Sequence, residues 1–214
     1  MSFVFSYIRI RGTDLGEHIT LFFMTAIMPL FLWKNCMLRL FPIIKRQRTT
    51  LYHPLINPID LALMHGITQF IVYFILFMGV NWFFVLIYDY VGGQYTPLVF
   101  IPLACNALIG LGMGMVIFAI AEAFPYIRTI VPMFILPIMI TSGKFYTAET
   151  VNPRLLEIVE WNPFFQSTEL TRTLYYYEYT SPVFSPTYYF GWTIVCAFLF
   201  FGLERLMRPR IMTM

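Results

Sequence analysis

Long apolar runs separated by short polar segments dominate the chain, and the longest run covers residues 61–88. A helix needs about 20 mainly apolar residues to cross the roughly 30 Å hydrocarbon core of a bilayer. The pattern predicts about five spans, at 17–33, 61–88, 97–121, 125–142 and 188–204. The expected fold is therefore all-α, a polytopic membrane helix bundle in which residues 1–214 form a single domain.

Two Asn-Pro pairs, Asn152-Pro153 and Asn162-Pro163, lie between the last two apolar runs. Proline fits the first position of a helix, and the preceding Asn can cap it. We therefore expect one short helix from Pro153 and another from Pro163 toward Tyr175. At 1.5 Å per residue each is about 15 to 20 Å long, too short to cross the membrane alone. The sequence predicts a re-entrant helical hairpin within an outer segment at 143–187.

Composition supports a membrane protein, because 59% of the residues are hydrophobic and 12% are charged. Soluble domains average about 45–50% apolar and 25% charged residues. Aromatic residues make up 19% of the chain, which suits interfacial belts or a lined passage. The three cysteines lie far apart in apolar runs, and we interpret them as packing residues.

Charge placement predicts the orientation of the bundle, because short loops rich in Lys and Arg stay in the cytosol. With the spans above, nine of the fourteen cations fall on one side and eight of the eleven acids on the other. The side that is rich in cations is expected to be cytosolic and includes the C-terminus. The cations on that side are Lys34, Arg39, Lys45, Arg46, Arg48, Arg128, Arg205, Arg208 and Arg210.

The segment at 34–56 mixes five of these cations with apolar residues, as an amphipathic helix on the cytosolic surface would. Two functions fit this pattern from the residues alone. The segment could bind anionic lipid headgroups, or it could dock a cytosolic subunit that moves the adjoining spans.

No motif indicates catalysis, a metal site or nucleic-acid binding by this chain. The glycine-rich run at 110–114 follows no strand and lacks the Lys of a phosphate-binding loop. Its small residues instead permit close helix approach in lipid. His18, His53 and His65 lie too far apart for a metal site. Any work driven by ATP would therefore require a partner.

Glu169 and Arg172 lie three residues apart on the second helix of the hairpin and would share a face. An ion pair there could neutralise both charges in a partly desolvated site. The same two residues are also the candidates for an outward-facing polar site, if the chain were a membrane-embedded transferase.

Two motifs resemble the membrane subunit of type-2 ATP-binding-cassette exporters, most closely the capsular polysaccharide export permeases. The first is HPLINPID at 53–60, which is similar to the segment that opens a spanning helix in that family. The second is WNPFF at 161–165 followed by ELTR at 169–172, which resembles the family's segment after the fifth span. The loop at 122–128 resembles the family's short cytosolic loop before that span. The resemblance begins at about residue 18 and reaches the C-terminus.

The resemblance implies six spans preceded by an interfacial helix, so the family's first span is expected to be missing from this chain. It implies that contacts with an ATPase subunit come from the basic segment and the loop at 122–128, through Lys34, Arg39, Lys45, Arg46, Arg48, Glu122 and Arg128. It places the hairpin over the passage. The pathway residues implied are Trp161, Asn162, Pro163, Phe164, Phe165, Glu169 and Arg172, and we add Tyr175, Tyr176 and Tyr177 as wall candidates from their position.

The hypothesis from the sequence is a homodimeric exporter of capsular or related lipid-linked polysaccharide in the bacterial inner membrane. The chain would bind no cofactor, and ATP and Mg would be used by a cytosolic ATPase subunit. Expected partners are that subunit, a second copy of the chain, the polysaccharide, membrane lipids, and periplasmic or outer-membrane export components. Three alternatives remain open: an exporter of O-antigen or teichoic acid, a membrane-embedded transferase, and a truncated non-functional permease.

Overall fold

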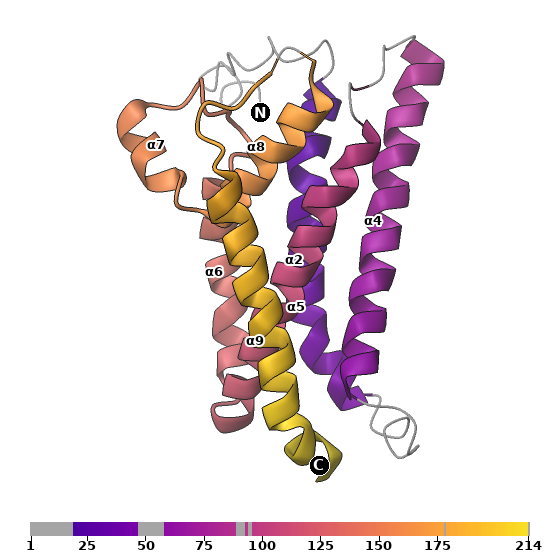
Figure 1. The fold of residues 1–214 in the computed structure, drawn as a ribbon, viewed down its shortest axis with the longest axis vertical. Helices are drawn as coiled ribbons and strands as arrows, with labels where there is room; N and C mark the ends of the chain where they lie inside the picture. The colour runs from indigo at the N-terminus through magenta and orange to yellow at the C-terminus, as the bar shows by residue number, and fades with distance from the viewer. Residues whose placement is uncertain (1–18, 47–57, 89–92, 94–95, 178, 214) are drawn as a thin grey trace.

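A computed structural model describes residues 19–46, 58–88, 93, 96–177 and 179–213, and within these ranges every regular element is helical. Figure 1 shows long helices side by side, with shorter ones at one end of the bundle. The elements, in chain order, are α2 (Ile19–Arg46), α4 (Pro58–Tyr88), the 3-10 helix η2 (Thr96–Val99), α5 (Phe100–Ala123), α6 (Ile127–Thr141), α7 (Pro153–Val159), α8 (Pro163–Tyr175) and α9 (Pro186–Thr213).

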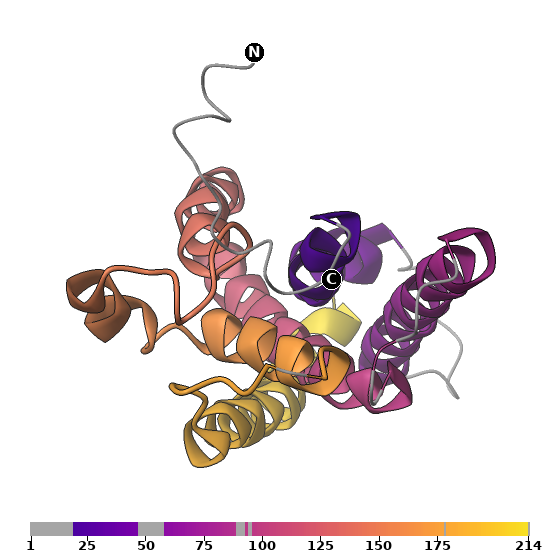
Figure 2. The same cartoon turned by 90° about the horizontal axis from the view of Figure 1, so that it is seen from above.

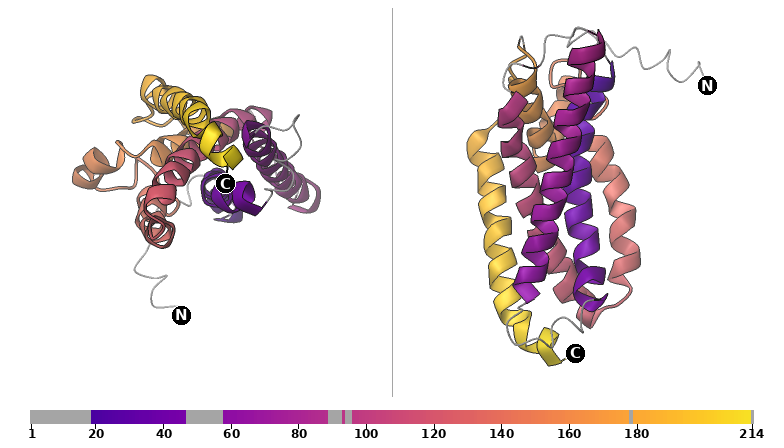
Figure 3. Two further views of the ribbon diagram at one scale, coloured as in Figure 1. Left: turned by 90° about the horizontal axis from the view of Figure 1, so that it is seen from below. Right: turned by 90° about the vertical axis from the view of Figure 1, so that its right-hand side faces the viewer.

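The bundle has two distinct ends (Figure 1). Helices α7 and α8 lie at the end where α2, α5 and α9 begin and where α4 and α6 finish. The last turns of α9 lie at the opposite end, as the side view in Figure 3 also shows. Seen from above in Figure 2, α8 lies near the middle of the bundle, while α7 projects outward on the left.

Helix α5 is the centre of the bundle because glycines let two neighbours approach its backbone. A Cβ added at Gly110 would lie 2.7 Å from the backbone O of Trp33 on α2. A Cβ added at Gly112 would lie 2.3 Å from the backbone O of Cys196 on α9. The glycine-rich run thus serves close helix packing, as the sequence predicts, with α2 on one side and α9 on the other.

Within the described ranges, four stretches of helix are long and apolar enough to cross a membrane: α2 over Ile19–Ile44, α4 over Ile59–Tyr88, η2 with α5 over Thr96–Ala123, and α9 over Pro186–Met207. Helix α6 is apolar but has only 15 residues, about 22 Å of helix. Many large apolar side chains of α4 and α6 are exposed, including Leu86 and Met133. Such surfaces suit a lipid environment. The all-helical polytopic fold expected from the sequence is confirmed.

Helix α2 includes residues of the first span expected at 17–33 and of the segment at 34–56 that the sequence assigns to the cytosolic surface. The helix continues without a break to Arg46. Its apolar positions recur every three or four residues beyond Lys34, and Met37, Leu40 and Ile44 are buried in the core. The Lys34 ammonium lies 4.1 Å from the centroid of the Phe31 ring, so one cation is accommodated within the helix. The rest of the segment, 47–56, lies outside the described residues.

The packing of α5 leads to a prediction for Gly112→Ala. The added methyl group meets the Cys196 carbonyl, which belongs to a helix backbone that cannot yield cheaply, so we expect a loss of about 1–3 kcal/mol of stability. Thermal unfolding of the purified protein in detergent measures the loss. Gly79→Ala is the control, because a Cβ there meets no described atom within 4 Å. Equal melting temperatures for the two variants would contradict the close approach of α5 and α9.

Candidate functional site

The two Asn-Pro pairs start the hairpin helices as the sequence predicts. The side-chain O of Asn152 accepts a hydrogen bond from the backbone N–H of Arg154 at 3.0 Å and caps α7. The side chain of Asn162 caps α8 in the same way, through the N–H of Phe164 at 2.9 Å. The amide of Asn162 also donates to Thr141 Oγ1 at 2.9 Å, so the cap ties the start of α8 to the last turn of α6.

Helix α8 is unusual because it is polar in sequence and yet buried almost all round. Its hydroxyl groups are satisfied locally, since Thr168 donates to the Phe164 carbonyl and Thr171 to the Ser167 carbonyl. Buried polar groups must find such partners or destabilise the fold. The buried polar residues of α8 are Gln166, Ser167, Thr168, Glu169, Thr171 and Arg172.

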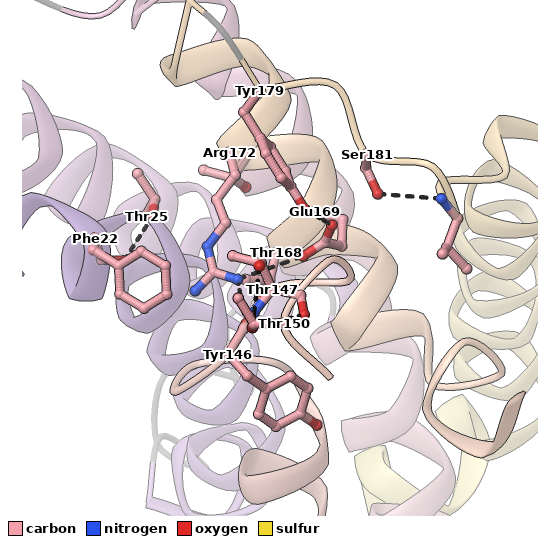
Figure 4. A network of polar contacts seen from close by, with 12 residues as sticks. Phe22, Thr25, Tyr146, Thr147, Thr150, Thr168, Glu169, Arg172, Tyr179 and Ser181 are labelled. Atoms are coloured by element: carbon pink, nitrogen blue, oxygen red, sulfur yellow. Dashed lines mark hydrogen bonds and ion pairs between the residues drawn. The ribbon is translucent and has the colours of Figure 1, made fainter. Parts of the chain in front are cut away.

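Glu169 and Arg172 form the ion pair that their spacing predicts, and both side chains are fully buried. Arg172 Nη1 lies 3.4 Å from Glu169 Oε1 and donates to the backbone O of Tyr146 at 2.7 Å. The Tyr179 hydroxyl donates to the other carboxylate oxygen of Glu169. The guanidinium carbon lies 4.1 Å from the centroid of the Phe22 ring on α2. As Figure 4 shows, the pair thus joins α8 to α2 and to the segments on both sides of the hairpin.

The protonation states of the groups in this network follow from their burial. Burial and the adjacent Glu169 carboxylate raise the pKa of Tyr179 far above its usual range, so the phenol keeps its proton and donates it. Arginine keeps its positive charge in proteins. Nε and Nη2 of Arg172 are buried without a hydrogen-bond partner among the described residues. The Glu169 carboxylate is therefore the main group that compensates the buried cation.

A second polar cluster joins α8 to α5 and α9. The side-chain amide of Asn106 donates to Ser167 Oγ at 2.7 Å, and the Tyr189 hydroxyl lies 3.2 Å from the same oxygen. Nearby, the Tyr175 hydroxyl donates to Asn81 Oδ1 on α4 at 2.8 Å. Sequence reasoning missed this cluster. Its signal is the presence of Asn81 and Asn106 within otherwise apolar runs, where a polar side chain needs a partner.

The aromatic residues suggested for a passage wall divide into two groups. Phe164 packs against Trp33 with ring centroids 3.9 Å apart, and Phe165 is fully buried next to Tyr146. Tyr175 and Tyr176 are buried as well. These four side chains belong to the protein core rather than to an open surface. The exposed ones are Trp161, at 67% of its maximal area, and Tyr177, at 79%.

The residues suggested for ATPase contact lie along α2 and near the α5–α6 turn, and not all lie together. The Arg128 guanidinium lies 3.7 Å from the centroid of the Phe41 ring, so the start of α6 meets the last third of α2 at the end opposite the hairpin. Lys34 lies near the middle of α2 and is not part of this end. Arg39 is exposed and Glu122 is partly buried. Lys45 and Arg46 form the last turn of α2, and Arg48 lies outside the described residues.

This geometry favours a structural role for the ion pair over a chemical one. Both of its side chains are sealed from solvent, and each carboxylate oxygen of Glu169 already accepts a hydrogen bond. Within the described residues, no three His, Cys, Asp or Glu side chains gather in a way that could hold a metal ion. The buried polar network instead fixes α8 across the end of the bundle.

Removing one partner of the pair should unfold this end of the protein. Arg172→Ala leaves the Glu169 carboxylate buried without its cation, and losses of about 3–5 kcal/mol are typical of such changes. We expect a lower melting temperature and faster tryptic cleavage in detergent. Arg154→Ala on α7 is the matched control, because Arg154 and Glu157 have the same spacing but are both exposed. If Arg172→Ala melts like the control, the network does not hold the hairpin in place.

Comparison with known proteins supplies the remaining observation. The family model for the ABC-2 type transporter matches residues 1–175, which is most of the 214-residue chain. No curated protein matches the chain. The match begins at residue 1 and does not test whether a span of the family is missing. The described part of the chain has four helices able to cross a membrane, and the family model covers more than three quarters of the sequence. These two findings agree: the chain belongs to the ABC-2 type transporter family and is a multi-pass membrane protein.

Proposed function

We propose that two copies of this chain form the membrane pathway of an exporter for capsular or related lipid-linked polysaccharide, powered by a separate ATPase. The family match is the observation that supports transport. Membership implies a partner ATPase, because the family provides the membrane component of the transporter. The glycan substrate, the homodimer and the bacterial inner membrane come from the resemblance of residues 53–60 and 161–172 to capsular polysaccharide permeases.

The fixed hairpin supports a passage that opens near α7 and α8. A long polar sugar chain needs a continuous tunnel, and a chain of this size does not enclose one alone. A buried ion pair, the Asn162 cap and the Asn106 cluster hold α8 across one end of the bundle. Such an element can shape an opening while helices around it move. In the proposal, this end faces away from the cytosol.

The opposite end supports contact with the ATPase. The last third of α2 and the start of α6 meet there through Phe41 and Arg128. Arg39 is exposed about two turns before the end of α2. Arg205 is exposed near the end of α9. Exposed cations on the long helices α2 and α9 give the ATPase subunit a surface through which it can move these helices. Because α2 packs along α5, a displacement of α2 would reach the hairpin end.

The alternatives differ in how well they suit the structure. A membrane-embedded transferase would need Glu169 and Arg172 at an accessible site, whereas both are fully buried and bonded within the fold. Export of O-antigen or teichoic acid uses the same machinery and differs only in substrate. A genomic neighbour that encodes capsule synthesis, lipopolysaccharide synthesis or teichoic acid synthesis distinguishes these substrates.

Charge reversal tests the proposed ATPase contact. We expect Arg39→Glu combined with Lys45→Glu to abolish stimulation of the partner's ATP hydrolysis in reconstituted vesicles, because the cationic surface is then inverted. Arg154→Glu on α7 serves as the control for a surface charge at the other end. Stimulation that survives the double reversal would remove the ATPase contact from α2. Product formation by the purified chain without ATP would instead favour a transferase.

A further inference from the structure

A pocket of about 330 Å³ lies where the end of α7, the start of α8 and the start of α9 meet. Small-molecule sites span roughly 300–1,000 Å³, so this pocket is at the small end of that range. It is large enough for one ring-sized ligand and is open to the outside of the protein. Its lining residues are Glu160, Trp161, Gln166, Val183, Ser185 and Tyr188.

A buried glutamine holds the walls of this pocket together. Gln166 is 3% exposed, and its amide nitrogen donates to the backbone O of Glu160 at 2.9 Å and of Val183 at 3.2 Å. Its amide oxygen accepts from the backbone N–H of Ser185 at 2.9 Å. One side chain on α8 therefore holds the backbone at the end of α7 and at residues 183–185 around the cavity. The pocket is built before any ligand enters it, which lowers the ordering cost of binding.

Two aromatic rings meet edge to face at the pocket. Trp161 and Tyr188 have ring centroids 5.9 Å apart and planes at 87°. The Tyr188 hydroxyl donates to the backbone O of Trp161, which sets the position of its ring. Two thirds of the Trp161 surface is exposed. Trp192 follows Tyr188 on α9, and the centroids of these two rings lie 6.5 Å apart. The exposed indole of Trp161 offers a flat surface that suits the apolar C–H face of a pyranose.

The polar groups at the pocket disfavour an anionic ligand and suit one with hydroxyl groups. Glu160 is the charged residue of the lining, and its carboxylate has no ion-pair or hydrogen-bond partner among the described residues. A carboxylate accepts hydrogen bonds from hydroxyl groups and repels anions. The two rings meet edge to face and do not close a cage around a point charge, which the recognition of a quaternary ammonium would need.

We propose that this pocket binds one neutral pyranose residue of the exported glycan, stacked on Trp161 and hydrogen-bonded to Glu160. This assignment rests on the proposed function, because it identifies the neutral sugars of the glycan as the part recognised at the hairpin end. Uronic acid residues of an anionic polysaccharide are excluded from the pocket by Glu160. The row from Trp161 through Tyr188 to Trp192 then lies beside the emerging chain.

Fluorine NMR of the full chain in nanodiscs, with fluorotryptophan incorporated, tests the pocket without transport. The probes are methyl glycosides of glucose, galactose, mannose and N-acetylglucosamine, with glucuronate and choline as comparisons. We expect at least one neutral glycoside to shift the Trp161 resonance saturably and to leave the Trp82 resonance in place. Trp82 is the matched control, because it is 63% exposed but lies on α4. Glu160→Ala should raise the half-saturating concentration at least threefold.

The other outcomes overturn the proposal. A shift with choline alone assigns the pocket to a cation, and an equal shift with glucuronate removes the role of Glu160. Equal shifts at Trp82 and Trp161 indicate unspecific contact. If no glycoside shifts the Trp161 resonance, the pocket is not a sugar site. Export is measured separately, as surface glycan in cells that express the chain with its ATPase. If Trp161 responds while no export occurs, the pocket stands and the proposed transport function falls.

Discussion

The buried charge of Arg172 constrains the whole end of the molecule at which the hairpin lies. A guanidinium sealed from solvent destabilises the fold unless a carboxylate compensates its charge and acceptors take its hydrogen bonds. Glu169 provides the carboxylate one turn away, the Tyr146 carbonyl accepts from Nη1, and Tyr179 orients the carboxylate from the other side. These groups come from before, within and after the hairpin. Their mutual need explains why a polar helix lies buried across a bundle of apolar ones.

The parts of this arrangement that depend on neighbouring residues could be predicted from the sequence. Asn before Pro caps a helix through atoms two residues away, so both hairpin starts follow from local chemistry. The spacing of Glu169 and Arg172 likewise predicts their pairing, but not their complete burial. That burial depends on Phe22, Tyr146 and Tyr179, which no local pattern links to them. The continuation of α2 past Lys34 does not follow from the charge pattern, because a lysine can lie along an aromatic ring within a helix.

The two ends of the bundle differ in a way that suits a transporter subunit. One end is cross-linked by buried hydrogen bonds and an ion pair, and the other bears exposed cations near the ends of α2 and α9. Helix α5 connects them, since its glycines bring it against α2 and α9 along its length. A push on one end can therefore reach the other through packed backbones rather than through flexible side chains. In our proposal, the hairpin end faces away from the cytosol and its aromatic pocket binds a sugar of the exported glycan.

Labelling of single cysteines from either side of the membrane decides whether this arrangement is oriented as we describe. Ile158 on α7 is 70% exposed, and Arg205 lies near the far end of α9, so Ile158→Cys and Arg205→Cys report on the two ends. The native Cys36, Cys105 and Cys196 are buried and serve as the background. With a membrane-impermeant maleimide, we expect Ile158→Cys to react in cells whose outer surface alone is accessible and Arg205→Cys to react only in inside-out vesicles. The reverse pattern would place the hairpin in the cytosol and contradict the exporter account.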